Sequence, residues 1–201
     1  MKHYCAFDIE TAKTCKQVQD ELELPDERDA FKYPHRMGFG VGVVYDSKTK
    51  EFTEFKKGQD MVKFLLDFDG VLVSYNGKRF DIPALLPYMD IDVYNKLIRK
   101  PHLDLLENFY ARVNGKFRVP LDNIAKHSIG TQKIGSGADA PLLFQEGKIK
   151  ELMEYCKVDV AITSRILEFG MKNGHIRFWD KYKSKVVELP VNYVGMLKDE
   201  V

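Results

Sequence analysis

The sequence lacks several features that would define its class at once. No apolar run approaches the ~20 residues that cross a bilayer, and the N-terminus has no charged-then-apolar signal pattern. Cysteine is scarce: Cys5, Cys15 and Cys156 are odd in number and have no short metal-type spacing. This pattern argues against a zinc site and against a disulfide scaffold. Together these absences favour a cytoplasmic protein with no membrane partner.

Neither sign of charge is in excess. The 201 residues include 31 Lys and Arg and 30 Asp and Glu, so the formal net charge is +1. No global basic field therefore attracts polyanions, although a local basic patch is compatible with this balance. The glycine-containing loop at 131–138 lacks the Gly-Lys-Ser/Thr of a phosphate-binding loop. Lys133 in this loop is a weak candidate for phosphate contact.

The pattern of apolar residues predicts an α/β fold in one domain, residues 1–201. Hydrophobic residues make up 44% of the chain, enough for a well-packed core. The element order favours a mixed five-stranded sheet flanked by helices, followed by a C-terminal β-hairpin at 175–191. We interpret residues 12–35 as an inserted charged loop. Strands are expected at 4–9, 37–45, 51–55, 70–75 and 101–104, and helices at 59–68, 93–98, 105–113, 121–128, 141–144 and 148–172.

Two carboxylates lie at the end of the first predicted strand, in the run Phe7-Asp8-Ile9-Glu10-Thr11. Because strand residues two apart point to the same face, Asp8 and Glu10 project together. Neighbouring carboxylates at the end of an apolar strand repel each other and are costly to desolvate. A hard divalent cation such as Mg²⁺ would offset that charge. A solvated strand end is the alternative, and the pair alone does not decide between the two.

Two further aspartates lie at structurally informative positions. Asp81 lies between the strand 70–75 and a helix that starts Ile82-Pro83, so its position alone favours a helix N-cap over a metal ligand. Asp159 lies on the apolar half of the helix 148–172, four residues after Tyr155 and on the same face. A buried aspartate needs a cation or hydrogen-bond donors, so a bonded core residue and a metal ligand are equally open for Asp159.

The predicted topology brings these carboxylates together. With the first strand at the centre of the sheet, Asp8, Glu10 and Asp81 lie at neighbouring strand ends, and the long helix can carry Asp159 to the same place. Four carboxylates in one cleft do not all stay ionised without counter-charge. Two divalent ions ~4 Å apart would supply it, and phosphodiester-cleaving sites use this arrangement.

Three motifs in order resemble those of the DEDD superfamily of 3′–5′ exonucleases, which have an RNase H-like fold. Asp8-Ile9-Glu10 is similar to the first motif. Tyr75-Asn76 followed by Phe80-Asp81 is similar to the second, in the form seen in proofreading domains of family B DNA polymerases. Tyr155 to Asp159 is similar to the third, in the tyrosine variant called DEDDy. The resemblance covers residues 4–170, and the segment 12–35 and the C-terminal hairpin depart from it.

The resemblance implies a metal-dependent exonuclease that hydrolyses DNA or RNA from the 3′ end and releases nucleoside 5′-monophosphates. It assigns Asp8, Glu10, Asp81 and Asp159 to two Mg²⁺ or Mn²⁺ ions, and Tyr155 to orienting the attacking water. It implies a single-stranded 3′ end as substrate and leaves a polymerase or helicase partner open. Weaker candidates for substrate contact are Thr11, Asn76, Lys78 and Arg79.

Other functions fit the same fold, because a fold does not fix an activity. The first alternative is a noncatalytic nucleic-acid-binding module, which the presence of all four carboxylates and Tyr155 disfavours. The second is a metal-dependent endonuclease or resolvase, which the spacing of Tyr155 and Asp159 disfavours. The third is a small-molecule phosphodiesterase, which requires a closed pocket. Preference between DNA and RNA is not predicted, because no reader of the 2′-OH is recognisable.

Overall fold

The central sheet has five strands in the order β3-β2-β1-β4-β5, as predicted. In the computed structural model, which describes residues 3–131 and 139–197, β1 is antiparallel to β2 and parallel to β4. Lys133 lies outside the described residues. Because β1 and β4 are parallel, their carboxyl ends lie at the same edge of the sheet. The strands are β1 (Tyr4–Thr11), β2 (Phe39–Asp46), β3 (Phe52–Phe55), β4 (Val71–Ser74) and β5 (His102–Asp104).

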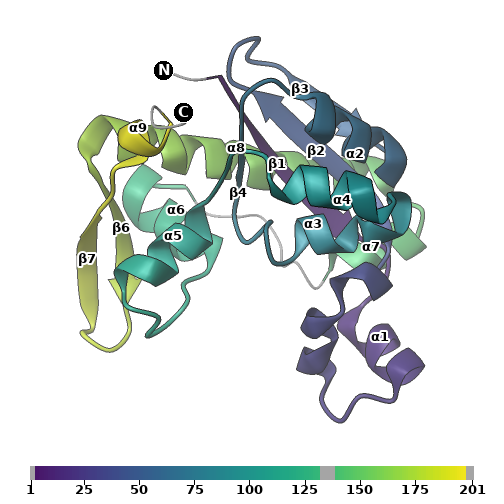
Figure 1. The fold of residues 1–201 in the computed structure, drawn as a ribbon. Helices are drawn as coiled ribbons and strands as arrows, with labels where there is room; N and C mark the ends of the chain where they lie inside the picture. Colours follow the sequence, from purple (N-terminus) through teal and green to yellow (C-terminus); the bar gives the residue numbers. More distant parts are fainter. Residues whose placement is uncertain (1–2, 132–138, 198–201) are drawn as a thin grey trace.

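Helices cover both faces of the sheet, so its strands are almost continuously apolar. One face carries α2 (Gly58–Asp67), α3 (Asp81–Ala84) and α4 (Ile91–Ile98). Along the other face runs α8 (Ile149–Asn173), which contacts β1, β2 and β4 (Figure 1). The alternation of β1 divides the core as predicted: Phe7 and Ile9 pack on the first face, whereas Tyr4 and Ala6 pack on the α8 face.

The chain between β5 and α8 forms α5 (Leu105–Arg112), α6 (Leu121–Ile129) and α7 (Ala140–Gln145). The predicted cap of α5 is confirmed, because the Asp104 carboxylate accepts hydrogen bonds from the backbone N–H groups of Leu106 and Glu107. The predicted C-terminal hairpin is present as β6 (His175–Asp180) and β7 (Lys185–Pro190). It is followed by the short helix α9 (Tyr193–Met196).

The segment 12–35 is not a loop, which corrects our expectation. It forms α1 (Cys15–Leu22) and the 3₁₀ helices η1 (Glu27–Lys32) and η2 (Pro34–Arg36). A capping box starts α1: Thr14 Oγ1 accepts from the Gln17 N–H, and Gln17 Oε1 accepts from the Thr14 N–H. Val18, Ala30 and Met37 form a small core of its own. Figure 1 shows this unit extending away from the sheet.

The segment is nevertheless tied to the sheet at both of its ends. The Ala12 N–H donates to the Gly38 carbonyl at 3.2 Å, and the Lys13 N–H donates to the Met37 carbonyl at 2.9 Å. These bonds continue the pairing of β1 with β2 beyond the strands, so α1 begins at a fixed place beside the end of β1. Among the described residues, no helix is both long enough and apolar enough to cross a membrane.

Candidate active site

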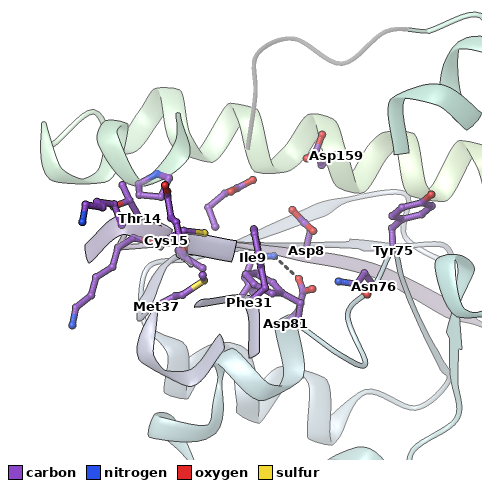
Figure 2. Close-up of a pocket in the computed structure, with 17 residues that line it drawn as sticks. Asp8, Ile9, Thr14, Cys15, Phe31, Met37, Tyr75, Asn76, Asp81 and Asp159 are labelled. Atoms are coloured by element: carbon purple, nitrogen blue, oxygen red, sulfur yellow. Dashed lines mark hydrogen bonds between the residues drawn. The ribbon is translucent and has the colours of Figure 1, made fainter. Parts of the chain in front are cut away.

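A cavity of about 560 Å³ opens at the carboxyl end of β1, beyond the residues of β1 that pair with β4. Three elements of the central fold contribute carboxylates to its lining: Asp8 and Glu10 from β1, Asp81 from α3, and Asp159 from α8. Glu27 of η1 also lines the cavity. Figure 2 shows Asp8 between Asp159 on the long helix and Asp81 below it. The volume is in the range of small-molecule sites.

Asp8 and Glu10 form the tightest group. Their ligand atoms and the Cys156 sulfur all lie within 4.8 Å of one another. The strand places both carboxylates on the face toward α8, as the alternation of β1 predicts. A register shift between Glu10 and Thr11 marks a bulge opposite Gly40. Gly40 is required there, because a Cβ would lie 2.9 Å from the Glu10 carbonyl oxygen.

Asp81 is not the N-cap of α3, which corrects the expectation drawn from its position in the sequence. It is the first residue of α3, and the preceding Phe80 supplies no side-chain cap. Instead Asp81 Oδ1 accepts a hydrogen bond from the Ile9 N–H at 3.0 Å, which fixes the carboxylate against β1 (Figure 2). Burial, with the nearby charges of Asp104 and Asp159, raises the pKa of Asp81 to about 7. A cation would relieve this cost.

Asp159 is buried on α8 and lines the same cavity. It lies three residues after Cys156, so both side chains are on one face of the helix. The long helix therefore faces the β1 carboxylates with an aspartate and a thiol. The acidic residues present fit divalent cations, because hard cations take carboxylate oxygens and the cavity gathers such oxygens from three elements.

Cys156 is a site residue that the sequence patterns did not single out. Its thiol lies 3.4 Å from the Asp8 carbonyl oxygen and 3.8 Å from Asp8 Oδ2, and it donates to these oxygens. Burial and the charges of Asp8 and Glu10 raise the pKa of the thiol well above its usual value. A protonated thiol is a hydrogen-bond donor and not a metal ligand. The available signal was its place on the helix, three residues before Asp159.

The predicted substrate-contact residues divide into two groups. Thr11 and Asn76 line the cavity, and Asn76 also borders a second, smaller hollow that contains Arg79. Lys78 and Arg79 are outside the cavity lining. The Lys78 ammonium lies 2.8 Å from the Glu107 carboxylate and forms an ion pair with it.

Tyr155 is also outside the cavity lining. It is half-buried on α8, one helical turn before Asp159. The segment 12–35 adds a wall to the cavity that the motifs do not predict, since Lys13, Thr14 and Phe31 line it. The cavity therefore has carboxylates at its base and a mixed cationic and aromatic side.

A family model described as RNase_H superfamily matches residues 27–169. The chain belongs to the RNase H superfamily. Members of this superfamily are typically nucleases that use divalent metals. The matched residues include Asp81, Tyr155 and Asp159, whereas Asp8 and Glu10 precede them. The fold nevertheless places the β1 pair in the cavity of this RNase H-like domain, because β1 is the central strand. The comparison with curated proteins gives no match.

Proposed function

We propose that this RNase H-like protein is a metal-dependent 3′–5′ exonuclease that releases nucleoside 5′-monophosphates from DNA or RNA. One observation carries the proposal: four carboxylates from β1, α3 and α8 line one cavity at the end of the central strand. Four such groups converge at a cost unless cations bind among them. The order of the three motifs supports the exonuclease reaction and the tyrosine subclass over other nucleases of this superfamily.

Asp8, Glu10, Asp81 and Asp159 are the proposed ligands of two Mg²⁺ or Mn²⁺ ions. When bound, the ions supply Lewis-acid stabilisation of the charge that develops on the phosphate. The Ile9 N–H fixes Asp81 against β1, so this ligand is held in place before any ion arrives. The protonated Cys156 thiol orients Asp8 through the hydrogen bonds described above.

Tyr155 is the proposed group that orients the attacking water, since its phenol lies one helical turn from Asp159. Thr11 and Asn76 line the cavity and are the proposed contacts of the terminal nucleotide. Lys78 and Arg79 are weaker candidates for backbone phosphates outside the cavity. Of the two, Arg79 is better placed, because it borders the hollow next to Asn76, whereas Lys78 is paired with Glu107.

The test uses end-labelled DNA and RNA, single- and double-stranded, with Mg²⁺, Mn²⁺ or chelator. We expect stepwise shortening from the 3′ end that requires metal. Asp8→Ala and Asp159→Ala should abolish turnover while the proteins stay folded by circular dichroism. Wild-type rates in either variant would contradict the assignment. A circular single strand should resist the enzyme, and cutting of that circle would indicate an endonuclease instead.

A further inference from the structure

The C-terminal hairpin is fixed to α6 by side chains that act like a neighbouring strand. Asn123 Oδ1 accepts from the Trp179 N–H at 2.6 Å, and Asn123 Nδ2 donates to the Trp179 carbonyl at 3.0 Å. Ser128 makes the same pair of contacts with the N–H and carbonyl of Arg177. Four hydrogen bonds therefore hold one edge of β6, so the hairpin presents its outer face in a defined position beside α6 (Figure 1).

The hairpin exposes two aromatic side chains, one on its outer face and one in its turn. Trp179 and Val186 are cross-strand partners, and each is 44% exposed. Tyr182 in the turn between the strands is 70% exposed. The His127 ring of α6 is stacked with the Trp179 indole, with 6.4 Å between the ring centroids. An exposed indole with one neighbouring ring has surface left for a further planar group.

Exposed lysines lie close in sequence to these rings. Lys126, Lys181 and Lys185 are all exposed, and the Lys181 ammonium lies 5.1 Å from the centre of the Tyr182 ring. Residues 110–127 contain four basic and one acidic residue, and residues 175–190 contain four basic and two acidic residues. These two segments thus carry a net charge of +5, whereas the rest of the chain carries −4 to reach the total of +1. The positive charge of this neutral chain is concentrated here.

A short segment joins this surface to the catalytic cavity. Val119 accepts a hydrogen bond at its carbonyl from the hydroxyl of Tyr75, a residue of the cavity lining. Arg118 borders the small hollow that Asn76 shares with the cavity. The Phe117 ring contacts the Tyr182 ring of the hairpin, with 5.5 Å between centroids. Three consecutive residues therefore lead from the cavity to the hairpin.

We propose that Trp179 and Val186 on one face of the hairpin, Tyr182, Lys181 and Lys185 in or next to its turn, and Lys126 of α6, together called the hairpin surface, bind the single-stranded part of the substrate upstream of its 3′ end. Bases would stack on the aromatic rings and phosphates would pair with the lysines, the combination used by single-strand-binding surfaces. A protein partner is disfavoured, because lysine is depleted in protein–protein interfaces. The proposal rests on the proposed function for the identity of the substrate.

The chain itself supplies the probe, because Trp179 is its only tryptophan. In chelator, where no turnover occurs, titration with an oligo(dT) of about 16 nucleotides should quench Trp179 fluorescence. An oligo(dT) of about 4 nucleotides has few nucleotides left for the hairpin when its 3′ end is in the cavity, so it should quench the fluorescence less than the 16-mer does. Absence of quenching by the longer strand would overturn the proposal.

Two sets of variants test the contacts, with affinity measured by anisotropy of the labelled 16-mer. Trp179→Ala should weaken binding roughly five- to hundred-fold, and Trp179→Phe should retain most of it. The triple variant Lys126→Ser, Lys181→Ser, Lys185→Ser should lower the slope of log K against log salt by about 2. Equal loss of affinity in Trp179→Phe and Trp179→Ala would contradict a stacking role.

The matched control removes the same charge elsewhere. Lys48, Lys50 and Lys172 are exposed and line a separate hollow beside His3, near the start of β1. The triple variant of these residues to Ser should bind the 16-mer as the wild type does. Equal weakening of binding in both triple variants would show that only the net charge of the protein matters, and this result would overturn the proposal. Metal-dependent cleavage of the 4-mer distinguishes failure of the hairpin proposal from failure of the proposed nuclease function. If the hairpin variants still cleave the 4-mer, the proposed function stands whatever the hairpin binds.

Discussion

Replacement of Asp81 by Asn should stabilise the metal-free protein, although it removes a proposed ligand. Burial and the neighbouring charges of Asp104 and Asp159 raise the pKa of Asp81 from 3.8 to about 7. The folded state therefore binds the proton more tightly than the unfolded state, and stability falls as the pH rises between these values. Above the pKa of the folded state, the ionised Asp81 destabilises the folded protein by the full amount, on the order of 4 kcal/mol.

Asparagine removes the charge and keeps an oxygen that accepts from the Ile9 N–H, the bond that Asp81 makes at 3.0 Å. At pH 8 in chelator we expect Asp81→Asn to unfold at a temperature roughly 8–16 °C higher than the wild type, since 1 kcal/mol shifts a chain of this size by about 2–4 °C. At pH 5 the wild-type carboxyl holds its proton, so the difference should shrink. Asp69→Asn is the matched control, because Asp69 is an exposed aspartate in the turn before β4.

Added Mg²⁺ or Mn²⁺ should narrow the difference in stability between the two proteins. An ion at 100 times its Kd stabilises the folded wild type by about 2.7 kcal/mol, and loss of a ligand should remove most of that gain in Asp81→Asn. Thermal unfolding followed by circular dichroism, with and without metal, measures both effects. Equal stability of the two proteins in chelator, or equal stabilisation of both by metal, would refute the account of the site as a set of mutually repelling carboxylates.

Three further predictions concern single residues. Tyr155→Phe should slow cleavage while leaving the metal-induced shift in unfolding temperature intact, and unchanged kinetics would remove its proposed role. Cys156→Ala should leave metal affinity within a few-fold of wild type in titrations followed by unfolding temperature, because the protonated thiol is not a ligand. Burial and the charge of Lys78 lower the pKa of His102 from 6.5 to about 3. The unfolded state therefore binds a proton more readily than the folded state, so the stability that is present above pH 6.5 is lost as the pH falls from 6.5 towards 3. In urea denaturation, the free energy of unfolding of the wild type should fall by at most about 4 kcal/mol between pH 7.5 and 4 because of His102, and His102→Gln should lack this loss. Parallel curves of unfolding free energy against pH for the two proteins would contradict this prediction.

The sequence predicted the sheet well because burial on both faces leaves a strong local signal. The runs at 39–46 and 71–74 are almost continuously apolar, and Gly174 ends the long helix in the left-handed conformation with a φ of 71°. The segment 12–35 was harder, because its helices are short and its core rests on few side chains. The capping box from Thr14 to Gln17, followed by Val18 and Leu22, was the usable signal.

The convergence of the four carboxylates on one cavity could be predicted from the sequence, whereas their contacts could not. Alternation along β1 places Asp8 and Glu10 on one face, and that follows from the sequence alone. The bond from Ile9 to Asp81 does not follow from sequence, because it joins residues that are 72 positions apart. The ion pair of Lys78 with Glu107 also depends on tertiary packing. Because of this pair, a residue that was predicted to contact phosphate contacts a carboxylate instead. Local pattern thus predicts the residue types, whereas the fold determines what each one contacts.

The two parts of the chain that depart from the exonuclease resemblance are related to the cavity in different ways. Lys13 and Phe31 of the segment 12–35 line the cavity directly. The hairpin is joined to it through Phe117 and the residues that follow. Under the proposed function, the carboxylates on elements of the shared fold carry out the reaction, whereas these additions contact the substrate. Substrate choice should therefore change with substitutions in the additions, while the dependence on metal stays with β1, α3 and α8.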